Sequence, residues 1–503
     1  MHALCVDVGT SVIKCVVYDG DGREIAVART PTTTLRPAPG HAEQDMDAVW
    51  DGVVRSVREA SHGLGAEIGL VACTAQGDGC WLVDDAGRPV GPAALWSDGR
   101  SAGIVERWHR DGTIERAFRI NGSMTFPGLP NALLHWLREH EPERLARAHK
   151  ALYCGGWIFL RLTGEFAVDE SDASAPLLDI RTRAYSQELM ELFDLEWAAP
   201  LLPEVRAAGQ PVGSLSQAAA VELSLPAGLP VVMAPYDIAA TAIGVGATAP
   251  GRACSILGTT LCTEVMSKGI DTDGPPSGFT IALGGEDDYL RAYPSLAGTE
   301  VIGWAVRLLG LTGPAELGAL AARAAVGPDD PVFLPYLSPG GERAPFLDPQ
   351  ARGMFLGLSL EHQPEHLALA VMEGLSHVIR DCLEASRTPV GELRLCGGGA
   401  NSNFWCQLIA DIAGIRTLRS ADSELGAKGA LISGLVATGT LPGVDSAPAG
   451  LVELRDSFEP REDRHAVHAD RFEQFKELRR ICTPAWQTLS AHREAPAPVG
   501  AHG

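Results

Sequence analysis

The stretch Leu4-Cys5-Val6-Asp7-Val8-Gly9-Thr10-Ser11-Val12-Ile13-Lys14-Cys15-Val16-Val17-Tyr18 decides how the N-terminal part of the chain folds. Its two apolar runs predict two strands, and the polar residues between them predict a tight turn. Gly9 lets backbone N–H groups approach an anion, Thr10 and Ser11 add hydroxyl donors, and Asp7 is able to face a hydrated Mg²⁺ ion. The turn therefore predicts either a plain hairpin tip or a phosphate cradle, and the rest of the chain decides between them.

Composition excludes several classes of function. The chain has 503 residues, which is enough for two or more domains. Its 41 basic and 63 acidic side chains give a net charge of −22, so we expect neither nucleic acid nor a membrane as a partner. The eleven cysteines form no CxxC pair, and no long apolar run or signal peptide occurs, which predicts reduced thiols in a cytoplasmic protein.

The opening pattern recurs in the second half of the chain. Residues 253–257 predict a strand, Gly258-Thr259-Thr260 a turn, and residues 261–266 a second strand. Two hairpins with Gly-Thr-Ser and Gly-Thr-Thr tips indicate an internal duplication, with one unit in each domain, and we expect both tips to face a shared cleft. The repeat favours the phosphate cradle over the plain hairpin.

Three more predicted strands end in polar or glycine-rich loops, which are Gln76-Gly77-Asp78-Gly79, Pro235-Tyr236-Asp237 and Gly397 to Ser402. The glycine and hydroxyl-rich loops suit the phosphates and sugar of a nucleotide. The carboxylates of Asp7, Asp78 and Asp237 suit Mg²⁺ binding, hydroxyl recognition and proton abstraction. Phosphoryl transfer from ATP to an alcohol needs this division of roles.

Several of these residues also have simpler interpretations. Asp237 is placed to cap the helix that follows it, and Asp78 is a typical turn residue. Asp98 and Arg100 either form a structural ion pair, which we favour, or touch a substrate. The role of Asp172 stays open.

In this order, the motifs resemble the FGGY family of carbohydrate kinases over nearly the whole chain. The residues that carry the resemblance are Asp7-Val-Gly-Thr-Ser11, Leu95-Trp-Ser-Asp98-Gly-Arg100, Gly164 to Ala173, Asp237 with Gly244-Val-Gly246, Gly258-Thr-Thr260, Gly353 to Leu360, and Gly397 to Trp405. The resemblance implies an α/β, two-domain actin-like ATPase (ribonuclease H-like) fold, each domain a central mixed sheet flanked by helices. We expect a sugar-binding domain over residues 1–246, an ATP-binding domain over 247–488, and a disordered tail over 489–503.

The resemblance also implies an ATP- and Mg²⁺-dependent kinase that phosphorylates a hydroxyl of a small polyol or ketose. Asp237 would be the general base, and Asp7 would help to hold Mg²⁺. The implied substrate-binding residues are Gln76, Gly77, Asp78, Trp96 and Asp237. The implied ATP-binding residues are Thr10, Ser11, Gly258, Thr259, Thr260, Gly398, Gly399, Ala400 and Asn403. The alternatives are a D-xylulose or ribulose-type pentulokinase and a catalytically silent sugar-sensing protein, and a homodimer is left open.

Departures from the family pattern bear on the substrate. Xylulokinases have Met-His, and glycerol kinases Arg-Glu, where this chain has Gly77-Asp78. After the implied base these relatives have Asn or Gln, whereas Ile238 offers no hydrogen bond to a substrate hydroxyl. The pairing of Gln76-Gly-Asp-Gly79 with Tyr236-Asp-Ile238 is most similar to the erythritol kinase and L-xylulose kinase branch. A carboxylate at Asp78 is able to accept two hydroxyl groups of an extended polyol.

Overall fold

The computed structural model describes residues 2–207, 212–285, 287–327, 329–448 and 450–494. They form two compact units. Unit 1 comprises Met1–Pro250, Met266–Ala292 and Ala421–Glu453, and unit 2 comprises Gly251–Val265, Tyr293–Ser420 and Leu454–Gly503. The expected domain boundary after residue 246 stays a prediction, and the units add that two later segments pack with the N-terminal part of the chain.

Unit 1 is built on a mixed sheet with the strand order β13-β14-β5-β1-β2-β3. β1 pairs antiparallel with β2 and parallel with β5, and β14 lies parallel beside β5. The strands are β1 (His2–Val8), β2 (Val12–Tyr18), β3 (Glu24–Pro31), β5 (Ile68–Ala75), β13 (Val212–Ser214) and β14 (Pro230–Met233). The opening stretch therefore forms the predicted hairpin, inside this sheet.

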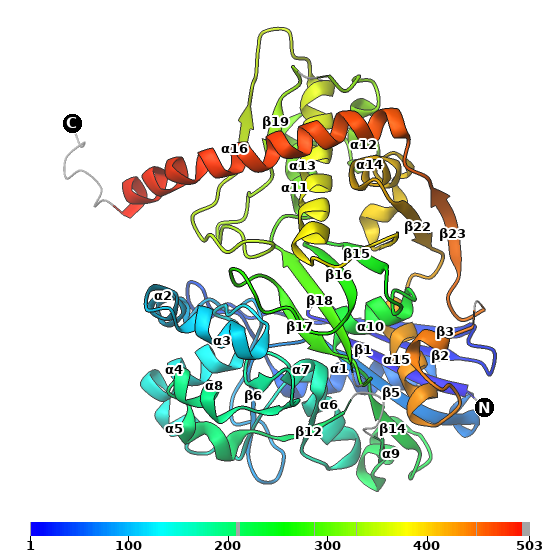
Figure 1. Ribbon diagram of the computed structural model, residues 1–503. Coiled ribbons are helices and arrows are strands. Elements are labelled where there is room, and N and C mark those ends of the chain that lie inside the picture. Colours follow the sequence, from blue (N-terminus) through cyan, green and yellow to red (C-terminus); the bar gives the residue numbers. More distant parts are fainter. Residues whose placement is uncertain (1, 208–211, 286, 328, 449, 495–503) are drawn as a thin grey trace, which may run out of the picture. The chain divides into compact units, whose positions relative to one another are not determined.

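Helices cover both faces of this sheet, which explains why β1 is apolar along most of its length. They are α1 (Met46–Ala60), α6 (Cys154–Thr163) and α9 (Gln217–Leu223) on one face, and α10 (Asp237–Gly244) and α15 (Leu425–Ala437) on the other. Leu4, Val6 and Val8 pack into the first layer, while Ala3 and Cys5 pack into the second. Figure 1 shows α15 in orange beside the blue strands β1 to β3, although more than 390 residues of chain separate them.

Glycines allow α10 and α15 to pack backbone against backbone. A Cβ at Gly244 would lie 2.1 Å from the Leu425 carbonyl oxygen, and a Cβ at Gly429 would lie 1.8 Å from the Ala240 carbonyl oxygen. No side chain fits at either position, because real Cβ contacts are never so short. This close packing fixes α15 against the helix that begins with Asp237.

The remaining elements of unit 1 surround this core. The helices are α2 (Ala102–Arg110), α3 (Thr113–Asn121), α4 (Pro130–His140), α5 (Pro142–Leu145), α7 (Glu170–Ala173) and α8 (Gln187–Leu192). The short strands are β4 (Glu43–Gln44), β6 (Trp81–Val83), β7 (Ala93–Ala94), β8 (Lys150–Leu152), β9 (Ala167–Asp169), β10 (Leu178–Asp179), β11 (Ala184–Tyr185) and β12 (Glu204–Arg206). β17 (Phe279–Ala282) pairs antiparallel with residues 289–292 of β18 (Asp288–Ser295).

Unit 2 contains sheet strands in the order β16-β15-β21-β22-β23. They are β15 (Arg252–Leu257), β16 (Leu261–Lys268), β21 (Glu392–Cys396), β22 (Arg416–Ser420) and β23 (Leu454–Phe458). β15 pairs antiparallel with β16 and parallel with β21, which repeats the pairing of β1 with β2 and β5. The predicted duplication of the opening hairpin is therefore visible in the pairing of the strands.

Helices and one small hairpin complete unit 2. They are α11 (Thr299–Leu308), α12 (Pro314–Ala321), α13 (Pro364–Ala385), α14 (Asn403–Ala413), α16 (Glu462–Glu494), β19 (Val332–Leu334) and β20 (Met354–Leu356). The expectation of a disordered tail is wrong for residues 489–494, because α16 continues through them; residues 495–503 lie outside the described residues. All eleven cysteines are buried, and none of them forms a disulfide. Among the described residues, no helix is both long enough and apolar enough to cross a bilayer.

Candidate active site

Asp7 lies at the end of the first hairpin strand and is 6% exposed. Lys14 Nζ lies 3.4 Å from Asp7 Oδ2 and also 3.4 Å from Glu424 Oε2. Burial raises the pKa of Asp7, against the opposing charge of Lys14. A Cβ at Gly426 would lie 2.7 Å from Asp7 Oδ2, so the first turn of α15 leaves room for this carboxylate only because residue 426 is glycine.

Thr10, Gln76 and Trp96 are joined by hydrogen bonds. Thr10 Oγ1 donates to Gln76 Oε1 at 2.7 Å and accepts from Trp96 Nε1 at 2.9 Å. Gln76 Nε2 donates to Gln44 Oε1 at 2.8 Å, and Gln44 Nε2 donates to the Thr10 carbonyl oxygen at 2.9 Å. Hydrogen bonds therefore join the hairpin tip, which we expect to bind phosphate, to the loop with Gln76, which we expect to bind the substrate. The Thr10 hydroxyl proton is donated within this network. Ser11, the other predicted hydroxyl donor, is exposed.

Asp237 begins α10, and its Oδ1 accepts the backbone N–H of Ile238 at 2.8 Å. The carboxylate is partly exposed. Burial, reinforced by the negative charges of Asp7 and Asp78, raises the pKa of Asp237 to about 7. A carboxyl group with this pKa is half ionised near neutral pH, which is the range in which a general base works best.

Hydrogen bonds hold the two residues before Asp237, which are Pro235 and Tyr236. Thr74 Oγ1 donates to the Pro235 carbonyl oxygen at 2.7 Å, and the Tyr236 N–H donates to Ser171 Oγ at 3.0 Å. The Tyr236 ring also packs on Gly77, where a Cβ would lie 2.3 Å from Tyr236 Cδ2. Gly77 therefore provides space for the ring of Tyr236.

Asp78 follows Gly77 with a φ of +58° and is partly exposed. Its backbone N–H donates to the carboxylate of Asp172, which lies on α7 and is 5% exposed. The carboxyl groups of Asp78 and Asp172 interact electrostatically with each other, and both interact with Asp237. The structure thus brings three carboxyl groups together, and the quoted family motif contained Asp172 without indicating its place.

Asp98 and Arg100 form the structural ion pair that we favoured. Arg100 Nη2 lies 2.8 Å from Asp98 Oδ2 and 2.5 Å from Glu43 Oε1, and the side chains of Arg100 and Asp98 are almost completely buried. Asp98 Oδ2 also accepts the Ala42 N–H at 2.6 Å. The charges of both residues are occupied in holding their loops together.

In unit 2, a cavity of about 840 Å³ opens beside the second hairpin tip. Of the predicted ATP-binding residues, Gly258, Thr259, Gly398 and Gly399 line it, whereas Thr260, Ala400 and Asn403 do not. The sequence reasoning missed the wall that α12 contributes, which is Pro314, Ala315, Gly318, Ala319 and the following Ala322. The small residues of this helix were its only sequence signal. Phe404 and Trp405 add aromatic surface.

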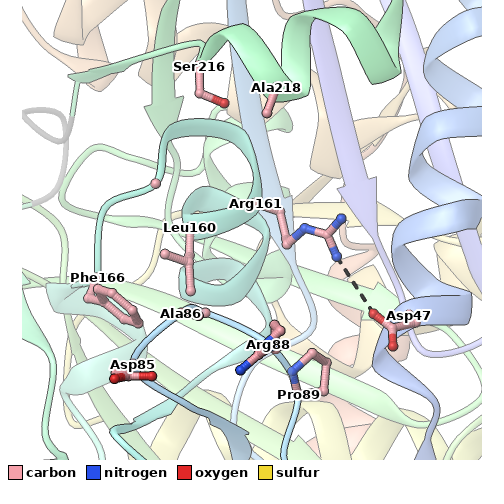
Figure 2. A pocket seen from close by; sticks show the side chains of 12 residues that line it. Asp47, Asp85, Ala86, Arg88, Pro89, Leu160, Arg161, Phe166, Ser216 and Ala218 are labelled. Carbon is pink, nitrogen blue, oxygen red and sulfur yellow. Dashed lines mark ion pairs between the residues drawn. The ribbon is translucent and has the colours of Figure 1, made fainter.

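Unit 1 holds another cavity, of about 590 Å³, that contains none of the predicted site residues. Figure 2 shows Arg161 on α6 reaching toward Asp47 on α1, with Arg88 and Asp85 on the loop below them. Arg161 Nη1 lies 3.8 Å from Asp47 Oδ1, and its guanidinium stacks over Trp50. The site residues predicted from the sequence lie outside this cavity, some of them in unit 1 and the others in unit 2.

The residues present fit a magnesium ion that arrives with a nucleotide. Mg²⁺ usually keeps several waters and binds one or two carboxylates together with substrate phosphates. Asp7 offers one such carboxylate, and the glycine at position 426 avoids the side chain that would otherwise crowd its Oδ2. Within the described part of the chain, no group of three or more His, Cys, Asp or Glu side chains is able to hold a metal ion alone.

Fold and site together define a kinase-like molecule with duplicated hairpins, and comparisons with known proteins identify its family. Residues 2–244 match the N-terminal domain, and residues 253–438 the C-terminal domain, of the FGGY family of carbohydrate kinases. The chain belongs to this family and is an ATP-dependent carbohydrate kinase. Comparison with solved structures of sugar kinases confirms the expected actin-like ATPase fold.

Individual relatives cover almost the whole chain. The erythritol kinase of Brucella abortus (strain 2308) is 32% identical, with 97% of each chain covered. The xylulose kinase of Escherichia coli (strain K12) is 31% identical, over 94% of this chain and 97% of the relative. The crystal structure of ligand-bound xylulose kinase from Lactobacillus acidophilus superposes with a TM-score of 0.91 at 23% identity, covering 97% of this chain and 99% of that one, and shows the shared fold.

Proposed function

We propose that this kinase transfers the terminal phosphoryl group of ATP to a hydroxyl of a small polyol or ketose, with Asp237 as the general base. The observation that carries this proposal is the state of Asp237: a partly exposed carboxyl whose pKa is raised to about 7. A base with this pKa is half ionised at pH 7 and mostly ionised at pH 8, and it still takes up a proton readily. Asp237 removes the proton of the acceptor hydroxyl as the oxygen attacks phosphorus.

Asp7 has a different role in this proposal. It would help to hold Mg²⁺ through water, and the ion would neutralise charge on the phosphates. Lys14 lies beside Asp7 and Glu424, and its positive charge partly balances the negative charges of these two carboxylates. The two residues at the hairpin tip, Thr10 and Ser11, offer backbone N–H groups to phosphate, because the Thr10 hydroxyl proton is engaged with Gln76.

The cavity in unit 2 suits the adenosine of ATP. Its lining is mainly apolar, with aromatic surface from Phe404 and Trp405 and small residues from α12. Nucleotide pockets are typically apolar clefts with a few polar groups that fix the ligand's orientation. Gly258 and Thr259 lie at the end of this cavity formed by β15, where they would meet the phosphates. Thr260, Ala400 and Asn403 remain proposed ATP contacts from the family pattern alone.

The acceptor is proposed to be a polyol, because Asp78 offers a carboxylate where the family's xylulokinases have a histidine. A site that hydrogen-bonds a substrate hydroxyl rejects analogues without that hydroxyl, by factors on the order of 10⁴. Gln76, Gly77 and Trp96 shape the same side of the site. The alternative of a pentulokinase is favoured by the 31% identity to a xylulose kinase. The homodimer and the cytoplasmic location stay predictions.

Coupled measurement of ADP release tests this proposal. The acceptors are glycerol, erythritol, D-threitol, ribitol, D-xylulose, L-xylulose and D-ribulose, each with Mg²⁺ and ATP. We expect the highest kcat/KM with a four- or five-carbon polyol. Turnover of the ketoses alone would establish the pentulokinase instead. Binding of an acceptor in a thermal-shift assay without any ADP release would establish the silent sugar-binding protein.

A further inference from the structure

One carboxylate in unit 1 has an oxygen that the protein leaves without a partner. Asp172 is 5% exposed, and its Oδ1 has no hydrogen-bond partner. The same carboxylate accepts the backbone N–H of Asp78, and no salt bridge reaches it among the described residues. A buried acceptor without a donor is costly, so such a group in a folded protein calls for a functional explanation.

The orientation of Asp172 is fixed by the turn that carries it. Asp169 Oδ1 accepts the Asp172 N–H at 3.0 Å and the Ser171 hydroxyl at 2.5 Å. The Ser171 Oγ in turn accepts the Tyr236 N–H, so α7 is attached to the segment that ends in Asp237. A Cβ at Gly155 would lie 3.3 Å from Asp172 Oδ2, so the start of α6 closes in on this second oxygen.

The surroundings show which part of the molecule this carboxylate faces. Burial raises the pKa of Asp172 well above its ordinary range, and the charges of Asp169, Asp78 and Asp237 add to this effect in that order. Asp172 therefore lies within reach of both carboxylates that the proposed function places at the acceptor. Asp169, which also has an unpartnered oxygen, is buried beside Cys73.

The chemistry of this group narrows the ligand to a neutral hydroxyl. A second anion would be repelled by the neighbouring carboxyl groups. A metal ion held by protein side chains alone is disfavoured, because no group of three or more ligating side chains is assembled in the described part of the chain. An alcohol O–H provides the missing donor without adding charge.

We propose that Asp172 Oδ1 accepts a hydrogen bond from a second hydroxyl of the acceptor, next to the hydroxyl bound by Asp78. This inference rests on the proposed function and deepens it, because it makes the acceptor a compound with two neighbouring hydroxyls in addition to the one that is phosphorylated. Asp172 is then a specificity-determining residue that touches substrate.

Pairs of acceptors that differ by one hydroxyl test the inference. The pairs are erythritol with 1,2,4-butanetriol, and D-xylulose with 1-deoxy-D-xylulose. The variants are Asp172→Asn and Asp172→Ser. Asp84→Asn is the matched control, because Asp84 also accepts backbone N–H groups, at Ala86 and Arg88, but lies in a surface turn. Steady-state kinetics and thermal unfolding are measured for every protein.

We expect Asp172→Asn to lower kcat/KM for the complete acceptor about 10- to 100-fold, mainly through KM, and to change the value for its deoxy analogue less than about threefold. The Tm of Asp172→Asn should equal or exceed that of the wild type, since a buried carboxyl is replaced by a neutral amide, whereas a purely structural role predicts a lower Tm. Asp84→Asn should leave acceptor discrimination unchanged.

The possible failures are distinguishable. An active wild type together with an Asp172→Asn variant of unchanged acceptor KM would overturn this inference alone. An equal loss with both members of a pair would also overturn it, because the lost interaction would not involve the missing hydroxyl. A folded wild type that phosphorylates no acceptor would overturn the proposed function and this inference with it. If Asp172→Asn does not fold, the same comparisons are made with Asp172→Ser.

Discussion

Replacing Asp237 by asparagine should remove activity and raise stability at the same time. The amide keeps the size of the side chain and its acceptor for the Ile238 N–H, but it cannot take up the acceptor's proton. General bases contribute about 10²–10⁴-fold to rate, so kcat should fall by that amount while ATP still binds. Stability should rise because the wild-type carboxylate is ionised in a site that disfavours its charge.

The size and pH dependence of the stability change follow from the pKa of Asp237. Folding raises it from 3.8 to about 7, a change of about three units at about 1.4 kcal/mol per unit. The folded state therefore holds the proton more tightly, and ionisation opposes folding. This penalty is absent below pH 3.8, grows as the pH rises to about 7, and is constant above that, at no more than about 4 kcal/mol for this partly exposed group.

Two measurements check this reasoning. Thermal unfolding of wild type and Asp237→Asn from pH 4 to pH 8 should show a Tm advantage of the variant that increases up to about pH 7 and then levels off. In wild type, kcat/KM should rise through the same range, reaching at pH 6 only about a tenth of its plateau, because only the ionised base is active. A kcat/KM that is flat from pH 5.5 to 8, or a Tm difference independent of pH, would refute the assignment of Asp237.

Gly318→Leu should fill the unit 2 cavity from α12 and raise the KM for ATP at least about tenfold with little change in the acceptor KM; an unchanged KM for ATP, measured by ADP release, would place the adenosine elsewhere. Arg100→Met should cost about 3–5 kcal/mol of stability, because Asp98 and Glu43 lose their buried partner, while both KM values stay within about twofold below the lowered Tm. A stable Arg100→Met variant with an impaired acceptor KM would instead indicate a role in the substrate site.

The sequence predicted the local features of the fold well, because they depend on neighbouring residues. Both Gly-Thr hairpins, the strand before Asp237 and the amphipathic α13 follow from periodicity and turn chemistry. The apolar run over residues 151–162 is compatible with a single helix, yet Lys150–Leu152 forms a strand because it pairs with β6. Short apolar runs are compatible with either structure, and the partner strand decides.

The site was predictable in its residue types and less so in its contacts. Asp7, Asp78 and Asp237 stood out as carboxylates at strand ends, and their charges do interact in the structure. The engagement of the Thr10 hydroxyl by Gln76, and the closure of α15 on Asp7, depend on side chains that are distant in sequence. No local pattern contains that information, and the same holds for the wall that α12 adds to the cavity.

The return of residues 421–453 to unit 1 has a consequence for synthesis on the ribosome. The face of the sheet that contains Ala3, Cys5 and Val232 is covered in part by α15, which begins at Leu425. At about 5–20 residues per second, about 9 to 35 seconds pass between the completion of residue 250 and the appearance of this helix. During that interval the nascent chain displays an apolar sheet surface, so folding of its N-terminal part cannot finish before α15 has been made.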